Sequence, residues 1–212
     1  LKGGASTLTQ NEIDRAKSFF TEPAYAKLDA AETAATLNSQ CKTDLIFANW
    51  VKRNTVAHRV SGYRIVNISL KATGYAPGDI TDKQLELIAD LADKYSFGEV
   101  RSTHQQNLVL ADVEQTQLKD LWHSLQKAGL ATANIGYLTD MICCPGGDYC
   151  SLANAKSIPV AEAIQSRFDD MDYVYDLGPL ELNVSGCMNA CGHHHIGHIG
   201  ILGVDKKGQE FY

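Results

Sequence analysis

Clustered cysteines in the last third of the chain constrain its fold more than any other sequence feature. Five of the six cysteines lie between residues 143 and 191. They include two spaced pairs, Cys144 with Cys150 and Cys187 with Cys191, and 36 residues separate the two pairs. A chain of 212 residues can bury a core without disulfides, and its first residues do not resemble a secretory signal. We therefore interpret the cysteines as ligands of a metal or a redox group.

Four thiolates suit an iron–sulfur cluster, because a [4Fe–4S] cluster takes one cysteine for each iron. Zinc is the main alternative: three residues separate Cys187 from Cys191, which fits zinc spacing, whereas the five between Cys144 and Cys150 do not. Buried thiols and disulfides are also compatible with the spacing. Glycines beside both pairs allow the backbone to turn closely around a bound group and to point N–H groups at it: Gly146, Gly147, Gly186 and Gly192.

Charge and composition exclude several classes of protein. The formal net charge is −6 and no basic tail is present, which argues against a nucleic-acid partner. The stretch from Leu182 to Val204 has no Asp, Glu, Lys or Arg, but its five glycines, four histidines and two asparagines exclude a membrane span. We predict a cytoplasmic globular protein with no membrane partner.

The hydrophobic periodicity predicts an α+β fold in three segments. Residues 1–60 are expected to form a helical packing or linker segment with no chemical motif. Its helical stretches are expected to end near residue 20, to run from about 25 to 37 and to run from about 45 to 51. Residues 61–130 follow the order strand, helix, strand, strand, helix, which begins the ferredoxin-like plan. In this segment Thr81 to Gln84 form a capping box that starts a helix. Residues 131–212 are expected to form the cofactor domain.

Within this last segment, the pattern predicts a helix and several short strands. The helix is expected to begin near Ser157, with Pro159 in its first turn. Short strands are expected at residues 182–184 and 199–204, the second followed by a turn at Asp205 to Gly208. Another strand would begin at Gln209, so we expect the chain to be a fragment whose cofactor domain is truncated.

Three motifs resemble those of the nitrite/sulfite reductase hemoprotein family. Ile142 to Lys156 and Gly186 to Gly192 are similar to the family's two cluster motifs, and Gly98 to Leu110 is similar to its Arg-x-Thr-x-x-Gln-Asn strand pair. The similarity covers roughly residues 55–212. It implies a ferredoxin-like half-domain followed by part of a domain that binds a [4Fe–4S] cluster and siroheme.

The resemblance also implies roles for individual residues. Cys144, Cys150, Cys187 and Cys191 match the cluster ligands, and Cys191 matches the thiolate that also binds the siroheme iron. Other positions match family residues that contact or lie beside the cofactors: Arg101, Thr103, Gln106, Asn107, Ala153, Asn154 and Asn189. His193 stands where relatives have arginine, which implies a contact with the siroheme carboxylates as one possible role. The histidines 193, 194, 195 and 198 are interpreted either as proton donors or as neutral packing groups.

The function implied is the six-electron reduction of sulfite to sulfide in assimilatory sulfur metabolism. Ferredoxin or an NADPH-dependent flavoprotein is the expected electron donor. Reduction of nitrite to ammonia by the same cofactors is the alternative within the family. The family's anion-binding cations come mainly from a half that this sequence lacks, so catalytic residues are not assigned. A non-catalytic iron–sulfur module and a zinc-stabilised domain are the alternatives from other classes.

Overall fold

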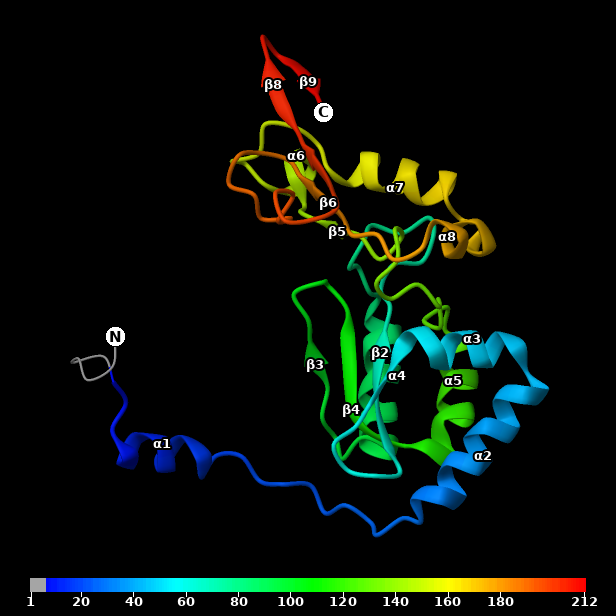
Figure 1. Ribbon diagram of the computed structural model, residues 1–212. Helices are drawn as coiled ribbons and strands as arrows, with labels where there is room; N and C mark the ends of the chain where they lie inside the picture. The colour runs from blue at the N-terminus through cyan, green and yellow to red at the C-terminus, as the bar shows by residue number, and fades with distance from the viewer. Residues whose placement is uncertain (1–6) are drawn as a thin grey trace.

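The computed structural model describes residues 7–212, so the first six residues of the expected linker lie outside it. The chain has the predicted α+β fold and forms two parts. The first part is a four-stranded sheet with its helices, and the second is a smaller unit that contains the cysteine pairs. In Figure 1 the smaller unit lies above the larger one, and the C-terminus lies at its far end.

The sheet of the first part is antiparallel, with strand order β1-β2-β4-β3. Strand β1 was not foreseen; it pairs with β2 and adds a fourth strand to the predicted unit. Helix α4 begins as predicted, since Thr81 and Gln84 form both bonds of the capping box. The elements are β1 (Thr55–Ala57), β2 (Tyr63–Ile68), α4 (Asp82–Tyr95), β3 (Arg101–Ser102), β4 (Leu108–Glu114), a 3₁₀ turn η1 (Gln115–Gln117) and α5 (Leu118–Lys127).

Three helices precede the sheet. They are α1 (Gln10–Lys17), α2 (Ala30–Thr43) and α3 (Leu45–Asn54). A helix was expected from about residue 25, but α2 begins at Ala30 because the Asp29 carboxylate accepts hydrogen bonds from two N–H groups of its first turn. Helix α1 buries none of its residues and lies apart from the rest of the molecule (Figure 1).

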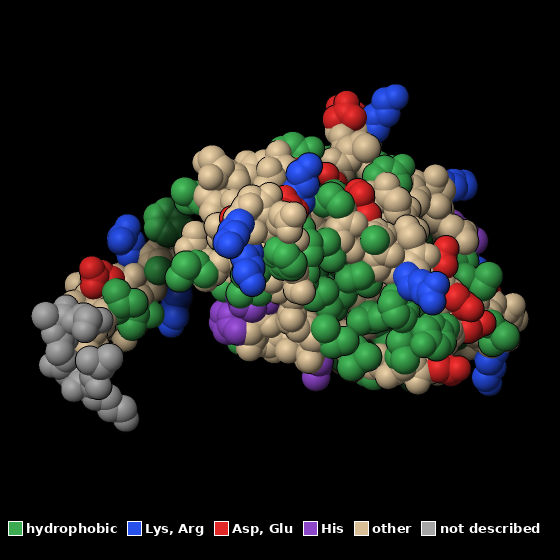
Figure 2. All heavy atoms as spheres, turned by 90° about the horizontal axis from the view of Figure 1, so that it is seen from above, with side chains coloured by type: hydrophobic (Ala, Val, Ile, Leu, Met, Phe, Trp, Pro, Cys, Tyr) green, Lys and Arg blue, Asp and Glu red, His purple; other side chains and the backbone are tan. Residues whose placement is uncertain are grey.

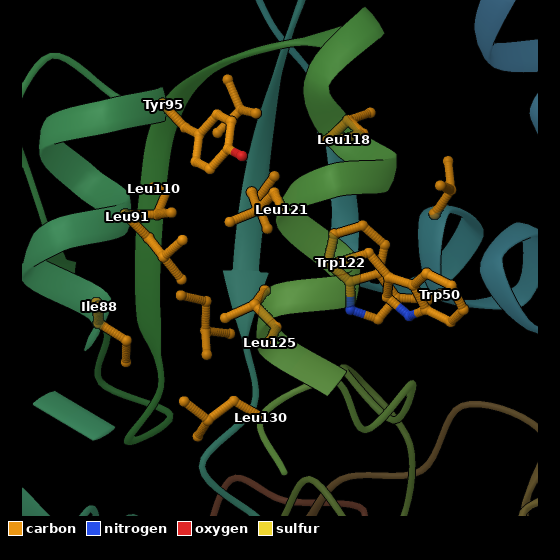
Figure 3. Packing of buried hydrophobic residues seen from close by; sticks show 14 of the residues in the cluster. Trp50, Ile88, Leu91, Tyr95, Leu110, Leu118, Leu121, Trp122, Leu125 and Leu130 are labelled. Atoms are coloured by element: carbon orange, nitrogen blue, oxygen red, sulfur yellow. The ribbon is translucent and has the colours of Figure 1, made fainter. Parts of the chain in front are cut away.

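The main core joins α3 to the sheet and its helices. Phe47 and Trp50 of α3 are 0% exposed, and the Phe47 ring lies 5.4 Å from the Trp122 ring of α5. Figure 3 shows Trp50 beside Trp122, and Leu121 and Leu125 of α5 facing the sheet. Helix α3 therefore contributes to the core of the ferredoxin-like unit, so this part of residues 1–60 is a packing segment rather than a linker.

The second part is built on a parallel three-stranded sheet of order β5-β6-β7. The predicted helix near Ser157 is α7, and the predicted strand at 182–184 is β6. Helix α8, capped by the Asp170 carboxylate, was not foreseen. The elements are β5 (Ile142–Cys143), α6 (Gly146–Tyr149), α7 (Ile158–Arg167), α8 (Met171–Leu177), β6 (Leu182–Ser185), β7 (Ile199–Leu202), and the hairpin of β8 (Val204–Lys206) and β9 (Gln209–Phe211).

The surface of the second part has apolar and charged regions. Figure 2 looks down on this part and shows apolar side chains gathered in the middle of the face, with charged groups of both signs interspersed. An open apolar groove of about 520 Å³ lies along α7, between Pro159 and Phe168. Across residues 7–212, none of the helices combines the length and the apolar character that a membrane crossing requires.

The packing of α3 generates a stability prediction. Phe47→Ala removes a fully buried ring from the core, and we expect it to lower the free energy of unfolding by about 3–5 kcal/mol. Ile46→Ala on the same helix is the control, because Ile46 is 68% exposed. Urea denaturation followed by tryptophan fluorescence measures both. Equal effects of the two substitutions would contradict the assignment of α3 to this core.

Candidate cofactor site

The two cysteine motifs follow adjacent parallel strands and therefore lie at the same edge of a sheet. Strand β5 leads into Cys144, and strand β6 leads into Gly186 and Cys187. The Cys144 N–H donates to the Val184 carbonyl at 3.1 Å, and the Gly186 N–H donates to the Cys144 sulfur at 3.1 Å. The backbone thus brings together two motifs that are far apart in the sequence.

The close approach of the two motifs depends on glycine. A Cβ atom on Gly186 would lie 2.5 Å from the Ala155 carbonyl oxygen and 2.9 Å from the Cα of Gly146. Gly146 itself has a φ of +56°, in the left-handed region that favours glycine. Any side chain at residue 186 would therefore push the two motifs apart.

The four expected ligand thiols differ in exposure. Cys144 and Cys187 are buried, Cys150 is partly buried and Cys191 is exposed, and none forms a disulfide. Burial raises the pKa of the neighbouring Cys143 thiol to about 12. Cys143 is therefore a neutral side chain, and it packs in the apolar core of the second part.

The cysteines fit a cluster in their chemistry but not in their spacing. The free thiols and the adjacent loops suit an iron–sulfur group in their chemistry. Within residues 7–212, however, no three His, Cys, Asp or Glu side chains lie close enough together to hold one metal ion. The four thiols would therefore have to come closer together to hold a cluster.

A cavity of about 200 Å³ lies between the ferredoxin-like unit and the second part. Three of the expected cofactor residues line it, namely Thr103, Asn107 and His193. His193 has a φ of +53°, and its carbonyl oxygen accepts a hydrogen bond from the Asn183 side chain at 2.9 Å. The cavity thus joins the predicted strand pair to the loop that follows Cys191.

Other expected residues lie elsewhere. Arg101 is exposed, pairs with Glu99 and lines a separate hollow on the sheet. Asn189 is exposed, and Ala153 is partly buried. The Asn154 side chain is exposed as well, although its N–H donates to the Gly186 carbonyl at 2.8 Å. Their contacts with a cofactor stay predictions.

Gln106 connects the strand pair to the first cysteine motif. Its side-chain amide donates to the Cys143 carbonyl at 2.7 Å and accepts from the Cys143 N–H at 2.9 Å. Both polar ends of the amide are therefore bonded to the backbone immediately before Cys144. A cofactor role for Gln106, implied by the sequence motif, stays a prediction.

A buried ion pair lies beside the cavity and was not foreseen from the sequence. Lys71 is 2% exposed, and its Nζ lies 3.4 Å from Oδ1 of Asp140. Asn107 donates to the same Asp140 oxygen at 2.8 Å. Burial raises the pKa of Asp140 and lowers that of Lys71, and each charge partly offsets the shift of the other. No sequence signal pairs these residues, because they are 69 positions apart.

Comparison with known proteins places the first part in a family. Residues 60–128 match the family described as the nitrite/sulfite reductase ferredoxin-like half domain. These residues belong to the nitrite/sulfite reductase family. The match begins just after β1 and ends just after α5, so it covers β2 to α5 of the first part and leaves out β1 and α3.

Individual nitrite/sulfite reductases are similar over a larger part of the chain. "Sulfite reductase [ferredoxin] 2" of Mycolicibacterium paratuberculosis is 28% identical, over 70% of this chain and 28% of its own length. "Ferredoxin--nitrite reductase" of Synechococcus elongatus is 26% identical, over 76% and 31%. The solved NirA protein of Mycobacterium tuberculosis has a TM-score of 0.57 and 25% identity, covering 73% of this chain and 29% of that one. The chain thus spans less than a third of the length of these reductases.

The buried pair generates a prediction of pH dependence. Lys71→Met leaves the Asp140 carboxylate buried without its cation, and we expect a loss of about 3–5 kcal/mol in unfolding free energy at neutral pH. The pKa of Asp140 is already raised in the folded state, and removal of the ammonium raises it further. Because protonation then favours the folded state, the difference from the parent chain should shrink as the pH falls from 7 to 5.

Urea unfolding at several pH values measures this difference. The double variant Lys71→Met/Asp140→Asn is the matched control, since it has no buried carboxylate and its stability difference should not change over this pH range. If Lys71→Met lowers the unfolding free energy by the same amount at every pH, Asp140 is not the group that causes the loss of stability.

Proposed function

We propose that the protein is a siroheme- and [4Fe–4S]-dependent reductase that converts sulfite to sulfide with six electrons. The observation that carries the proposal is the placement of both cysteine motifs at one sheet edge, with the Gly186 N–H on the Cys144 sulfur. The family match over residues 60–128 and the names of the similar proteins support an oxidoreductase of this kind.

Four cysteines of this chain would hold the cluster. Cys144 and Cys187 are buried, and the less buried Cys150 and Cys191 would complete the ligand set. Cys191 is proposed also to ligate the siroheme iron. When bound, the two cofactors would supply electrons to the substrate; the protein's own contribution described here is to hold and orient them.

The cavity between the two parts is proposed to face the siroheme. Its lining includes the carboxylates of Asp140 and Glu181, and it also offers uncharged amides and a hydroxyl, from Asn67, Thr103, Asn107 and Asn183. Such groups suit the carboxylate-bearing rim of the macrocycle, because they can donate hydrogen bonds without carrying charge. The cavity lining includes no lysine or arginine, so the cations that bind an anionic substrate would come from other parts of the full protein.

Nitrite reduction is the second candidate. It is favoured by the matching ferredoxin-dependent nitrite reductase, whose identity of 26% is close to the 28% of the sulfite reductase. Both relatives carry ferredoxin in their names, and we propose ferredoxin as the electron donor here. Neither substrate is distinguished by the cavity residues that the structure describes.

Turnover by the full-length protein tests the proposal. Protein purified without oxygen is given sulfite or nitrite with reduced ferredoxin, and sulfide and ammonia are measured. We expect sulfide from the parent protein. Loss of a ligand in Cys187→Ser should reduce both iron content and turnover by at least about 100-fold, since even outer partners of a metal site contribute about 10- to 100-fold.

Cys41→Ser is the matched control for this substitution. Cys41 packs beside the main core, far along the chain from the motifs, and its removal should leave iron and turnover unchanged. Formation of ammonia without sulfide would show that nitrite, and not sulfite, is the substrate. A protein that contains the cofactors but forms neither product would contradict the proposal. It would indicate an iron–sulfur module without catalysis.

A further inference from the structure

We infer that Gln106 and Lys71 are positioning residues through which the ferredoxin-like unit fixes the first cysteine loop. The contacts themselves are features of this chain, while their role toward a cluster rests on the proposed function. Gln106 lies between β3 and β4 of the first part, and Cys143 is the last residue of β5 in the second. The bonds between them therefore cross from one part to the other.

The Gln106 contact suits a primary amide. One end of the side chain donates to a carbonyl and the other accepts from an N–H, and an amide does both without carrying charge. The Gln106 backbone has a φ of +59°, a conformation that side-chain residues rarely adopt. Its side chain also lies against Gly78, where a Cβ would come within 3.0 Å of it. Gln106 is thus held in position from several directions.

Lys71 holds the backbone that carries Gln106. Its ammonium donates to the carbonyl oxygens of Gln105 and Gln106 and, at 3.1 Å, to the side-chain oxygen of Asn107. Asn107 in turn accepts from the Leu70 N–H at 3.1 Å. An ammonium buried to this degree is stable only where oxygen atoms surround it. The left-handed turn at Gln106 therefore forms part of the shell that Lys71 requires.

The chain of contacts ends at the thiol. Gln106 fixes the peptide groups on both sides of Cys143, and the next residue places its sulfur within 3.1 Å of the Gly186 N–H. Because Gly186 precedes Cys187, the spacing between the two cysteine motifs depends on where Gln106 holds the end of β5. Weakening this contact should loosen the first motif without removing any ligand.

Hydrogen exchange in the full-length apoprotein tests the contact without any cofactor. The Cys143 N–H donates to Gln106, so Gln106→Ala should accelerate its exchange about tenfold, the effect of losing one ordinary hydrogen bond. Gln106→Glu keeps the accepting oxygen and should accelerate it less. Lys71→Met should accelerate this exchange as well, because the carbonyl oxygens of Gln105 and Gln106 lose the ammonium that holds the turn. Gln126→Ala and Lys83→Met, at exposed helix positions, are matched controls and should show parent rates.

A spectroscopic readout tests the role toward the cluster. After anaerobic reconstitution, we expect Gln106→Ala and Lys71→Met to keep all four cysteines but to show a broadened or shifted electron paramagnetic resonance signal of the reduced cluster. The two controls should reproduce the parent signal. A merely destabilised protein would lose signal intensity without a change in its shape.

The two readouts separate this inference from the proposed function. Parent-like exchange at Cys143 in Gln106→Ala would overturn the inference even if the cluster is present. Altered exchange with an unchanged cluster signal would also overturn it, because the contact would then be structural only. If the parent protein takes up no cluster at all, the proposed function fails, while the exchange data still decide whether Gln106 and Lys71 fix the cysteine loop.

Discussion

The buried ammonium of Lys71 sets the relation between the two parts of the molecule. A charge that is 2% exposed needs compensation, and this one obtains it from backbone oxygens of the loop at 105–106, from Asn107 and from Asp140. The loop belongs to the ferredoxin-like unit, and Asp140 precedes β5 of the second part. Separation of the two parts would break the ion pair of Lys71 with Asp140 and the hydrogen bond from Asn107 to the same carboxylate, so these contacts favour the observed junction.

The arrangement of the cysteine motifs depends on that junction. Strands β5 and β6 run parallel and end together, which places Cys144 and Gly186 in contact, and Gln106 holds the end of β5 from the other unit. Glycine at residue 186 allows this approach, since a Cβ there would meet backbone atoms of both Ala155 and Gly146. The same loop that surrounds Lys71 also forms one wall of the cavity through Thr103 and Asn107. One set of polar contacts thus orders the cavity and the first cysteine loop.

Local signals predicted the local structure well, and long-range polar contacts could not be predicted. The capping box at Thr81 and the apolar spacing after it identified α4. The expected approach of the two cysteine motifs is seen where the Gly186 N–H meets the Cys144 sulfur, while the four-cysteine ligand set stays a prediction. A helix over about residues 45–51 was predicted, but its partners in the core were not, because exposed Leu45 and Ile46 stand next to buried Phe47 and obscure which face of the helix is buried. Strand β1 has only three residues, too few for an alternating pattern. Lys71 and Asp140 are far apart in sequence, and a single lysine after a strand gives no sign of a buried partner.

Metal and cofactor analysis of the anaerobically purified full-length protein tests the central claim most directly. The account predicts four irons and four acid-labile sulfides for one [4Fe–4S] cluster, with a fifth iron in extractable siroheme, as about one of each cofactor per chain. Stoichiometric zinc with neither sulfide nor siroheme, persisting after reconstitution with iron and sulfide, would contradict it. In that case the two cysteine motifs would form a structural zinc site rather than a cofactor site of a reductase.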